Sequence, residues 1–295
     1  MSIVINTPTS NIGRALATRL LDAGENVTVL SREKKKVDEL VRRGARVIEG
    51  SFEDPALLAK ALEGAEALFW LTPPPARPDY YAWATKCAKQ AAAAAKKAGA
   101  RRAVVLSSAG AHTGPGTGPV GPGREMENDF EAALPAVVSL RPGIFMENFL
   151  RSAETIAKTG QIFLPIPPGK RWPLVATADI ANKAACWLLD RSWSGHHRVG
   201  VHGPKDLSTD EAAAVISSVL GKPVKCVELT PDQARGAMHS MGMPEFVVDI
   251  IIEMYVAYIE GRLDAAELRT PDTTTPTTLA EFARTTLVPA IRASL

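Results

Sequence analysis

The sequence predicts an α/β protein, with a doubly wound parallel sheet followed by a small C-terminal capping subdomain. Three observations support this fold class. Short, almost wholly apolar segments alternate with amphipathic ones through the first half of the chain. The connections between these segments are short, and the pattern becomes mixed beyond Arg141. Apolar strands between helices indicate a parallel sheet covered on both faces, and right-handed crossovers then give the doubly wound arrangement.

The first domain, predicted over residues 1–150, contains strands separated by helices. The strands are short runs rich in Val, Ile and Leu, and the helices repeat apolar side chains at helical spacing, as at Ile12, Leu16 and Leu20. The predicted strands are 3–5, 27–30, 46–49, 67–71, 103–106 and 136–140, and the predicted helices are 12–23, 35–43, 55–62, 79–98 and 125–133. Residues 110–123 hold six glycines and three prolines, which predicts a mobile loop.

Residues 151–295 are predicted to be mainly a substrate-capping subdomain, with some elements that return to the core. From residue 147 onward the predicted helices are 147–158, 180–190, 209–220 and 244–261, and the predicted strands are 197–201 and 224–229. The last helix has an apolar stripe of Phe246, Ile250, Met254 and Tyr258. We expect this stripe to line a substrate pocket together with Met146 and with His112 from the glycine-rich loop.

Composition narrows the possible function classes. The chain has 295 residues, of which 46% are hydrophobic, and a formal net charge of +2, too small to indicate a nucleic acid or an anionic membrane as partner. No apolar run reaches the 18 residues of a membrane span. Three cysteines without CxxC spacing predict reduced thiols and no metal site. We therefore expect a cytoplasmic protein that acts on a small molecule, as a monomer or as a homodimer.

An altered glycine turn follows the first strand. Dinucleotide-binding folds place three glycines there, one for the tight turn, one for the approach of the pyrophosphate and one for close helix packing. At the corresponding spacing this chain has Thr7, Ser10 and Gly13. Only the third of the three glycines is therefore present.

The altered turn keeps other means of holding a phosphate. The helix that begins near Asn11 and Ile12 offers unpaired amides and the positive end of its dipole. The hydroxyls of Thr7, Thr9 and Ser10 could donate in place of the lost backbone contacts. We expect weakened or re-routed cofactor binding, and a purely structural turn is the alternative.

The end of the second strand bears on the choice of cofactor. Enzymes that prefer the non-phosphorylated cofactor usually carry Asp or Glu near this place to accept the ribose hydroxyl. This chain has Ser31 and Arg32 instead, with Lys35 and Lys36 close behind. A guanidinium suits a 2′-phosphate, so Arg32 backed by Lys35 or Lys36 predicts NADPH in preference to NADH. A solvated surface position for Arg32 is the alternative.

With these residues in view, the chain resembles the NmrA-like branch of the atypical short-chain dehydrogenase/reductases over nearly its whole length. The strongest segment is 140–149, which begins Leu-Arg-Pro-Gly and ends Glu-Asn-Phe. Further segments, in the order of the family, are 9–14, 50–55, 69–75, 178–181 and 220–224. The resemblance implies a Rossmann fold with a nicotinamide cofactor across its strand ends. The family includes reductases and also proteins that bind the cofactor only to sense redox state.

The resemblance also implies where each part of the cofactor would lie. The pyrophosphate would lie at residues 7–12, the adenosine phosphate at Arg32 and the adenine beside Ser51 and Phe52. The ribose and nicotinamide would lie near residues that end later strands, namely Thr72, Pro73, Ser107 and the turn with Pro142, Ile144 and Phe145. The chain departs from the family pattern by lacking glycine at positions 7 and 10 and the usual acidic residue at position 51.

The sequence offers no obvious protein acid for hydride transfer. The Tyr-x-x-x-Lys pattern of ordinary members of the superfamily is absent, and Gly123 stands where some relatives keep a lysine. Residues 125–127 are expected to be a solvated helix start. Ser107 or Ser108 could hydrogen-bond a substrate carbonyl, while Tyr81 and Tyr258 are expected to pack in the core or at a rim. Our preferred hypothesis is that the substrate supplies its own donor, for example a phenol beside the ketone.

These observations predict an NADPH-dependent ketoreductase that acts on a bulky, largely apolar carbonyl compound, such as an aromatic polyketide of secondary metabolism. Some antibiotic-pathway ketoreductases of this branch also lack the usual tyrosine, so the resemblance permits that assignment. The rival prediction is a non-catalytic redox sensor that binds NADP and acts through a protein partner. The apolar cap helix and the loop favour the enzyme, whereas the lost glycines and the missing acid favour the sensor.

Overall fold

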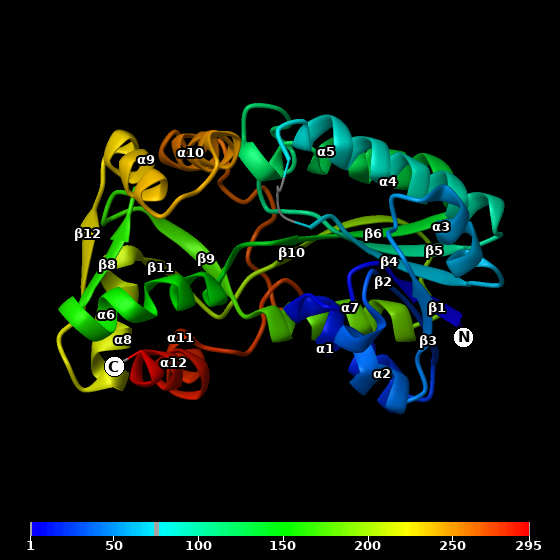
Figure 1. Ribbon diagram of the computed structural model, residues 1–295, viewed down its shortest axis with the longest axis horizontal. Helices are drawn as coiled ribbons and strands as arrows, with labels where there is room; N and C mark the ends of the chain where they lie inside the picture. Colours follow the sequence, from blue (N-terminus) through cyan, green and yellow to red (C-terminus); the bar gives the residue numbers. More distant parts are fainter. Residues whose placement is uncertain (1, 74–76, 295) are drawn as a thin grey trace.

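The computed structural model describes residues 2–73 and 77–294. Within them, seven strands form one sheet in the order β10-β6-β5-β4-β1-β2-β3 (Figure 1). The strands are β1 (Ser2–Ile5), β2 (Asn26–Ser31), β3 (Arg46–Glu49), β4 (Ala67–Leu71), β5 (Arg102–Leu106), β6 (Ala136–Pro142) and β10 (Gly195–Val201). All of their pairings are parallel. The predicted doubly wound fold is confirmed, and β10 adds a strand to this sheet from the second half of the chain.

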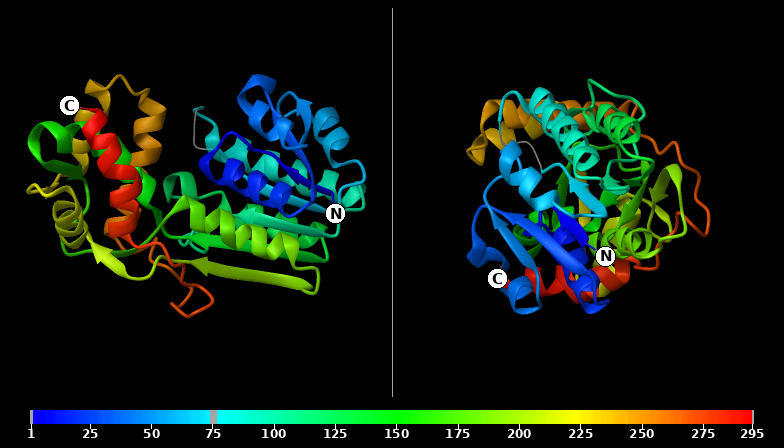
Figure 2. Two further views of the ribbon diagram at one scale, coloured as in Figure 1. Left: turned by 90° about the horizontal axis from the view of Figure 1, so that it is seen from below. Right: turned by 90° about the vertical axis from the view of Figure 1, so that its right-hand side faces the viewer.

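Helices cover both faces of the sheet (Figures 1 and 2). One face carries α1 (Asn11–Asp22), α2 (Asp38–Arg42) and α7 (Thr177–Leu189), and the other carries α3 (Pro55–Leu62), α4 (Tyr80–Lys97) and α5 (Gly123–Ala133). Leu16 and Leu188 are buried under the first layer, and Trp70 and Phe130 under the second. The apolar helix faces and the two-sided burial of the strands account for the fold, because removing this surface from water is the main stabilising term.

The direction of winding reverses between β1 and β4. After β1 the chain builds β2 and β3 outward, and it then returns to pair β4 with β1. Asn6, just past β1, is buried and extends the ladder: its Nδ2 donates to the Leu71 carbonyl at 2.8 Å, and the Leu71 amide donates to its Oδ1 at 2.9 Å. A side-chain amide thus satisfies the last backbone groups of β4 at the point where folds of this kind bind their ligands.

A second lobe lies beyond the carboxyl ends of the sheet strands (Figure 2). Within the described residues it contains a three-stranded sheet in the order β11-β9-β7 and a parallel pair of β12 and β8. Its strands are β7 (Ile144–Phe145), β8 (Gln161–Leu164), β9 (Arg171–Val175), β11 (Asp206–Ser208) and β12 (Lys225–Glu228), and its helices are α6 (Ala153–Thr159), α8 (Thr209–Leu220), α9 (Pro231–Ser240), α10 (Glu245–Ile259), α11 (Leu279–Phe282) and α12 (Val288–Ala293). An apolar cluster that includes Trp172, Ile216 and Phe282 forms its core.

Several short elements differ from the sequence prediction. The predicted helix 147–158 begins as a 3-10 segment, Met146–Ser152, and only then becomes α6. The predicted helix 35–43 likewise begins with a 3-10 turn, Lys34–Val37, before α2. Strands β7, β8, β9 and β11 and helices α9, α11 and α12 are not predicted, because most of these segments are too short to display a hydrophobic period.

The glycine-rich loop 110–123 runs from β5 to α5 and contacts the second lobe. Its 3-10 turn, Gly118–Val120, approaches α10 so closely that a Cβ on Gly118 would lie 2.3 Å from the Ile250 carbonyl oxygen. Arg262, just past α10, accepts through its carbonyl from Thr113 Oγ1 and donates from Nη1 to the Gly116 carbonyl, both at 2.5 Å. The loop that the sequence predicts to be mobile is therefore packed against the cap helix and hydrogen-bonded to the segment that follows it.

Two features are absent from residues 2–73 and 77–294. None of the helices in these ranges combines the length and the apolar character needed to cross a bilayer. The same ranges hold no group of three or more His, Cys, Asp or Glu side chains that could bind a metal ion.

Candidate functional site

The turn after β1 is built around the hydroxyl of Ser10. Ser10 caps α1, and its Oγ accepts from the Gly13 amide and donates to the Thr7 carbonyl, each at 2.9 Å. A Cβ on Gly13 would lie 2.0 Å from the Thr7 carbonyl oxygen, so only glycine fits at this position. The prediction that the Ser10 hydroxyl could donate to the cofactor is wrong, because its one proton already closes the turn.

Other groups of this turn remain available to a ligand. The amides of Asn11 and Ile12 lie in the first turn of α1, where a helix supplies no backbone acceptor and its dipole is positive. Thr7 Oγ1 is buried without a hydrogen-bond partner among the described residues, and Thr9 is exposed nearby. An orphaned hydroxyl, free amides and a close backbone approach suit the pyrophosphate of a dinucleotide. The residues present therefore fit the predicted cofactor.

The end of β2 carries an exposed group of basic side chains. Ser31 donates from Oγ to the Glu33 carbonyl at 2.9 Å, and the next residue, Arg32, is exposed. Arg32 has no hydrogen bond or ion pair with any described residue, whereas Lys36 is paired with Glu33 at 2.5 Å. Arg14, which the sequence prediction missed, donates from Nη2 to the Lys36 carbonyl at 3.1 Å. The guanidinium of Arg32 is thus available to an anion, and Arg14 lies against the same segment.

The two residues predicted to contact adenine follow β3. Ser51 Oγ accepts from the Glu53 amide at 3.2 Å, and Phe52 packs edge-on against Trp70 of β4, with ring centroids 5.3 Å apart. The carboxylate of Glu53 accepts from Trp83 Nε1 at 2.8 Å. Ser51 and Phe52 are half-buried at the carboxyl edge of the sheet, where an aromatic surface and a polar rim meet.

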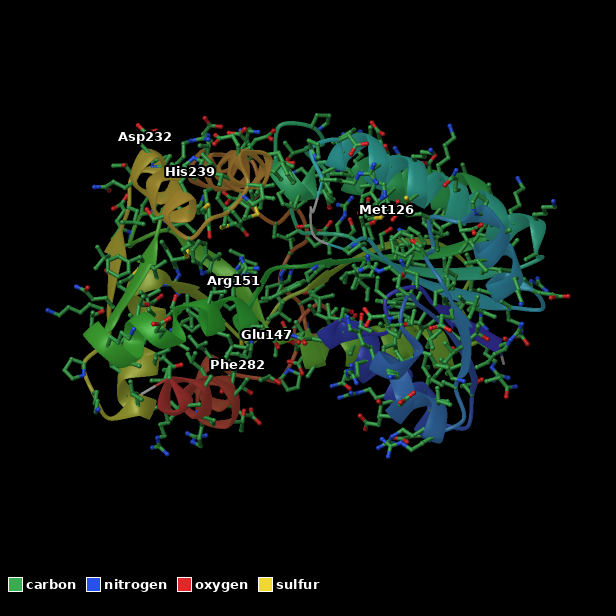
Figure 3. All side chains as sticks on the ribbon, viewed as in Figure 1. Met126, Glu147, Arg151, Asp232, His239 and Phe282 are labelled. Carbon is green, nitrogen blue, oxygen red and sulfur yellow. The ribbon has the colours of Figure 1, made fainter. Side chains whose placement is uncertain are left out.

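Thr72 and Pro73 follow β4 and are both half-buried. Thr72 Oγ1 accepts from Trp70 Nε1 at 3.2 Å and lies 3.4 Å from the sulfur of Met126, a residue of α5 that Figure 3 labels. Pro74 and Pro75, which belong to the family segment 69–75, lie outside the described residues.

The turn after β6 brings the family's strongest segment to the same edge. Pro142 is buried at the end of β6, and Ile144 and Phe145 are half-buried in β7. At Gly143, between these strands, a Cβ would lie 2.1 Å from the Pro173 carbonyl oxygen. Glycine is required here because β9 crosses directly against the turn. The ends of β4, β5 and β6 therefore bring together the residues predicted to surround the nicotinamide.

Ser107 is held by a carboxylate that the sequence analysis places in solvent. Its Oγ donates to Glu127 Oε1 at 2.5 Å, and Glu127 is fully buried on α5. Arg141 binds the same carboxylate twice, from Nε to Oε1 at 2.8 Å and from Nη2 to Oε2 at 2.5 Å. The prediction of a solvated helix start at residues 125–127 is therefore wrong for Glu127, and also for Met126, which is buried. The signal that could reveal it is Arg141, because a cation at the end of an apolar strand needs a buried partner.

The buried pair extends to a third charged group. Arg141 Nη1 also donates to Glu267 Oε1 at 2.6 Å, from the segment that follows α10. Burial disfavours the charged form of Arg141, but the hydrogen bonds and charges of Glu127 and Glu267 outweigh it and raise its pKa. The guanidinium thus stays ionised and links α5, β6 and the second lobe. Ser108, the neighbouring candidate, is half-buried.

The positions that bear on the missing acid are Gly123, Tyr81 and Tyr258. A Cβ on Gly123 would lie 2.9 Å from that of Ala111, so a lysine cannot occupy this position without rearrangement. Burial and a hydrogen bond to Glu125, at 2.8 Å, raise the pKa of Tyr81 to about 12. Burial also raises the pKa of Tyr258, with a smaller contribution from Asp264.

The predicted pocket residues divide into two residues at the core of the second lobe, one exposed loop residue and three residues on one face of α10. Met146 is only 1% exposed and belongs to the core of the second lobe, so its assignment as a pocket residue is wrong. Tyr258 packs edge-on against Trp172 at a centroid distance of 5.6 Å and also borders that core. His112 is exposed, and its ring contacts the Ala109 carbonyl at 3.2 Å.

The third group, Phe246, Ile250 and Met254, forms a half-buried apolar face of α10. These three side chains belong to none of the four apolar clusters formed by the described residues, whereas Val248 and Ile252 on the same helix pack against α9. The loop 110–123 covers part of this face, because a Cβ on Gly118 would lie 2.8 Å from Met254 Cβ.

Comparison with known proteins agrees with this geometry. Residues 9–141 match a family model described as NAD(P)H-binding. Over 291 residues the chain is 32% identical to an NAD(P)H azoreductase of Xenophilus azovorans, covering 96% of each protein. The chain belongs to the NmrA-like branch of the atypical short-chain dehydrogenase/reductases. The resemblance drawn from the sequence is thereby confirmed, and the family is one of NAD(P)H-dependent reductases.

Two further matches are a second reductase and a solved structure. The (4-alkanoyl-5-oxo-2,5-dihydrofuran-3-yl)methyl phosphate reductase of Streptomyces griseus is also 32% identical, over 80% of each chain. Among solved structures, NmrA, a negative transcriptional regulator in complex with NADP, is similar with a TM-score of 0.78 and 18% identity, covering 99% of this chain and 97% of NmrA. The second likeness shows a shared fold.

In this NmrA-like protein, two acidic residues of the family segments join parts of the structure. Glu147, which lies between the lobes in Figure 3, accepts from the Thr177 amide at 3.0 Å and from its hydroxyl at 2.5 Å. Asp179 accepts from the amide of Thr277 at 3.0 Å and from its hydroxyl at 2.9 Å. Glu147 is stabilised by the N-terminus of α7, and Asp179 ties α7 to the C-terminal segment.

Replacing Gly13 by Ala should weaken NADPH binding about tenfold or more, because the added Cβ displaces the Thr7 carbonyl and breaks the turn's contacts to phosphate. Isothermal titration measures the affinity. Gly236→Ala is the matched control, since nothing lies within 4 Å of the place that its added methyl group would take and its φ is ordinary for an L residue. Equal affinity in Gly13→Ala and Gly236→Ala would show that the turn does not hold the cofactor.

Proposed function

We propose that this protein is an NADPH-dependent ketoreductase that reduces a bulky, largely apolar carbonyl compound, such as an aromatic polyketide of secondary metabolism. The observation that carries the proposal is the half-buried apolar face of α10, formed by Phe246, Ile250 and Met254, which belongs to none of the apolar clusters of the described residues. A face of this kind beside polar strand ends suits a flat apolar ligand held next to a reacting group.

Different residues at the strand ends would bind different parts of the cofactor. The α1 amides and Thr7 would bind the pyrophosphate, and Arg32, with Arg14 nearby, would bind the 2′-phosphate. The ends of β4, β5 and β6 would surround the nicotinamide. When bound, NADPH supplies the hydride.

The proton is proposed to come from the substrate itself. Ser107 has committed its proton to Glu127, and the pKa values of Tyr81 and Tyr258 are raised, so these groups are poor acids at neutral pH. A phenol beside the ketone would polarise the carbonyl through an internal hydrogen bond and would protonate the oxygen as hydride arrives. The proton lost by the phenol is regained from solvent after the product is released.

The relatives support a reductase of conjugated small molecules. Their names denote an azoreductase and a reductase of a 5-oxo-2,5-dihydrofuran phosphate. A redox sensor is the second candidate, because the described residues of the site offer no obvious protein acid and the NmrA structure is that of a transcriptional regulator with NADP. Tight NADPH binding without reduction of any carbonyl in a broad screen would favour the sensor.

Replacing Arg32 by Ala should weaken NADPH binding about ten- to a hundredfold while leaving NADH binding unchanged, because the lost contact is a charge-assisted bond to the 2′-phosphate. Equilibrium titration with both cofactors measures the two affinities. Arg46→Ala is the control, since Arg46 is an exposed arginine at the amino end of β3. Parallel losses for NADPH and NADH would count against the assigned contact.

Methylating the phenol of an ortho-hydroxyaryl ketone should lower its kcat about a hundredfold, because the internal acid is then removed. The decay of NADPH absorbance in a single turnover, at saturating substrate, gives the rate constant of carbonyl reduction. An aryl ketone that carries the methoxy group in the para position controls for size and electronic effects. Reduction of the ortho-methoxy ketone at the full rate of the phenol would refute substrate-assisted protonation.

A further inference from the structure

The direction of the Ser107 hydroxyl is fixed by the groups behind it. A serine hydroxyl has one proton to donate and two lone pairs that accept. Ser107 Oγ lies 2.5 Å from Glu127 Oε1, and the backbone amide of Ser107 is used by the Leu140 carbonyl at 2.8 Å. Which way the hydroxyl proton points therefore depends on whether Glu127 is a carboxylate or a carboxylic acid.

The surroundings of Glu127 require a carboxylate. Oε1 already accepts from Arg141 Nε, and Oε2 accepts from Arg141 Nη2 and lies 3.3 Å from Arg198 Nε. The buried Arg141 guanidinium makes two of its hydrogen bonds to this fully buried carboxyl group, which is the geometry of a cation paired with a carboxylate. An ionised carboxylate can only accept hydrogen bonds, so the proton of Ser107 points toward Glu127.

The same arrangement leaves only the lone pairs of Ser107 for a ligand. Lone pairs directed at an oxygen that gains negative charge would oppose the reaction, so this hydroxyl is unsuited to a substrate carbonyl. It suits an N–H or O–H donor. Gly123 of α5 lies close to the hydroxyl, since a Cβ there would lie 3.3 Å from Ser107 Oγ, and as a glycine it places no side chain over it.

We propose that Ser107 is a positioning residue that accepts a hydrogen bond from the carboxamide N–H of the nicotinamide, with Glu127 and Arg141 setting its direction. The proposal rests on the proposed function, because it needs the cofactor in the site. The carboxamide is chosen because it is the N–H donor on the ring that must be oriented toward the substrate. Ser107 thereby fixes the ring's rotation and takes no part in proton transfer.

A double-mutant cycle on binding tests this assignment. The ligands are NADP+ and its 3-acetylpyridine analogue, in which a methyl group replaces the carboxamide nitrogen. Isothermal titration of wild-type protein and Ser107→Ala gives four affinities. We expect Ser107→Ala to weaken NADP+ binding about three- to tenfold, the range for one neutral hydrogen bond, and to leave the affinity for the analogue unchanged.

Two further variants separate this role from a structural one. Ser107→Thr keeps the hydroxyl and should restore the discrimination between the two ligands. Ser139→Ala removes a buried hydroxyl without a partner among the described residues on the neighbouring strand, and it should alter neither affinity. Equal losses for both ligands in Ser107→Ala would overturn the carboxamide contact and would point to a ribose hydroxyl or to the fold. No loss for either ligand would overturn it as well.

The failure of this inference is distinguishable from failure of the proposed function. If wild-type protein binds neither NADP+ nor the analogue, the proposed function itself fails. If wild-type protein binds both and Ser107→Ala shows no selective loss, the cofactor site stands and only the role of Ser107 is refuted.

Discussion

The buried ion pair of Glu127 and Arg141 is the constraint on which the candidate site depends. It joins α5 to β6, reaches the second lobe through Glu267 and fixes the hydroxyl of Ser107 at the end of β5. Removing one partner of such a buried pair costs about 3–5 kcal/mol, because the remaining charge is left without compensation. The pair therefore sets the relative positions of the strand ends, the cap and a polar group of the site at once.

The altered turn after β1 shows how a phosphate site can tolerate the loss of glycines. Ser10 replaces a glycine but uses its hydroxyl to cap α1 and to hold the Thr7 carbonyl, so the turn keeps its shape. Gly13 cannot be replaced in the same way, because the helix and the turn touch at that point. The groups that attract phosphate most strongly, the first amides of the helix, do not depend on side chains.

The sequence predicts the sheet well, because apolar strands and amphipathic helices depend on local patterns that a linear reading detects. It also predicts the close packing at Gly13, which has a local cause. The sequence does not predict three other features: the burial of Glu127, the burial of Met146 and the contact of Arg14 with the Lys36 carbonyl. Each is decided by a partner distant in the chain, so residue type and spacing alone do not reveal it. The short strands of the second lobe are missed for the same reason, since tertiary pairing defines them.

The most direct test of the account is an equilibrium titration of the unmodified protein with NADPH, with NADH run beside it. We expect one NADPH to bind per chain, more tightly than NADH, because the turn still holds the pyrophosphate and Arg32 contacts the extra phosphate. Absence of binding by either cofactor at millimolar concentration would contradict it. The turn after β1 would then be a structural feature alone, and both the reductase and the redox sensor would be excluded.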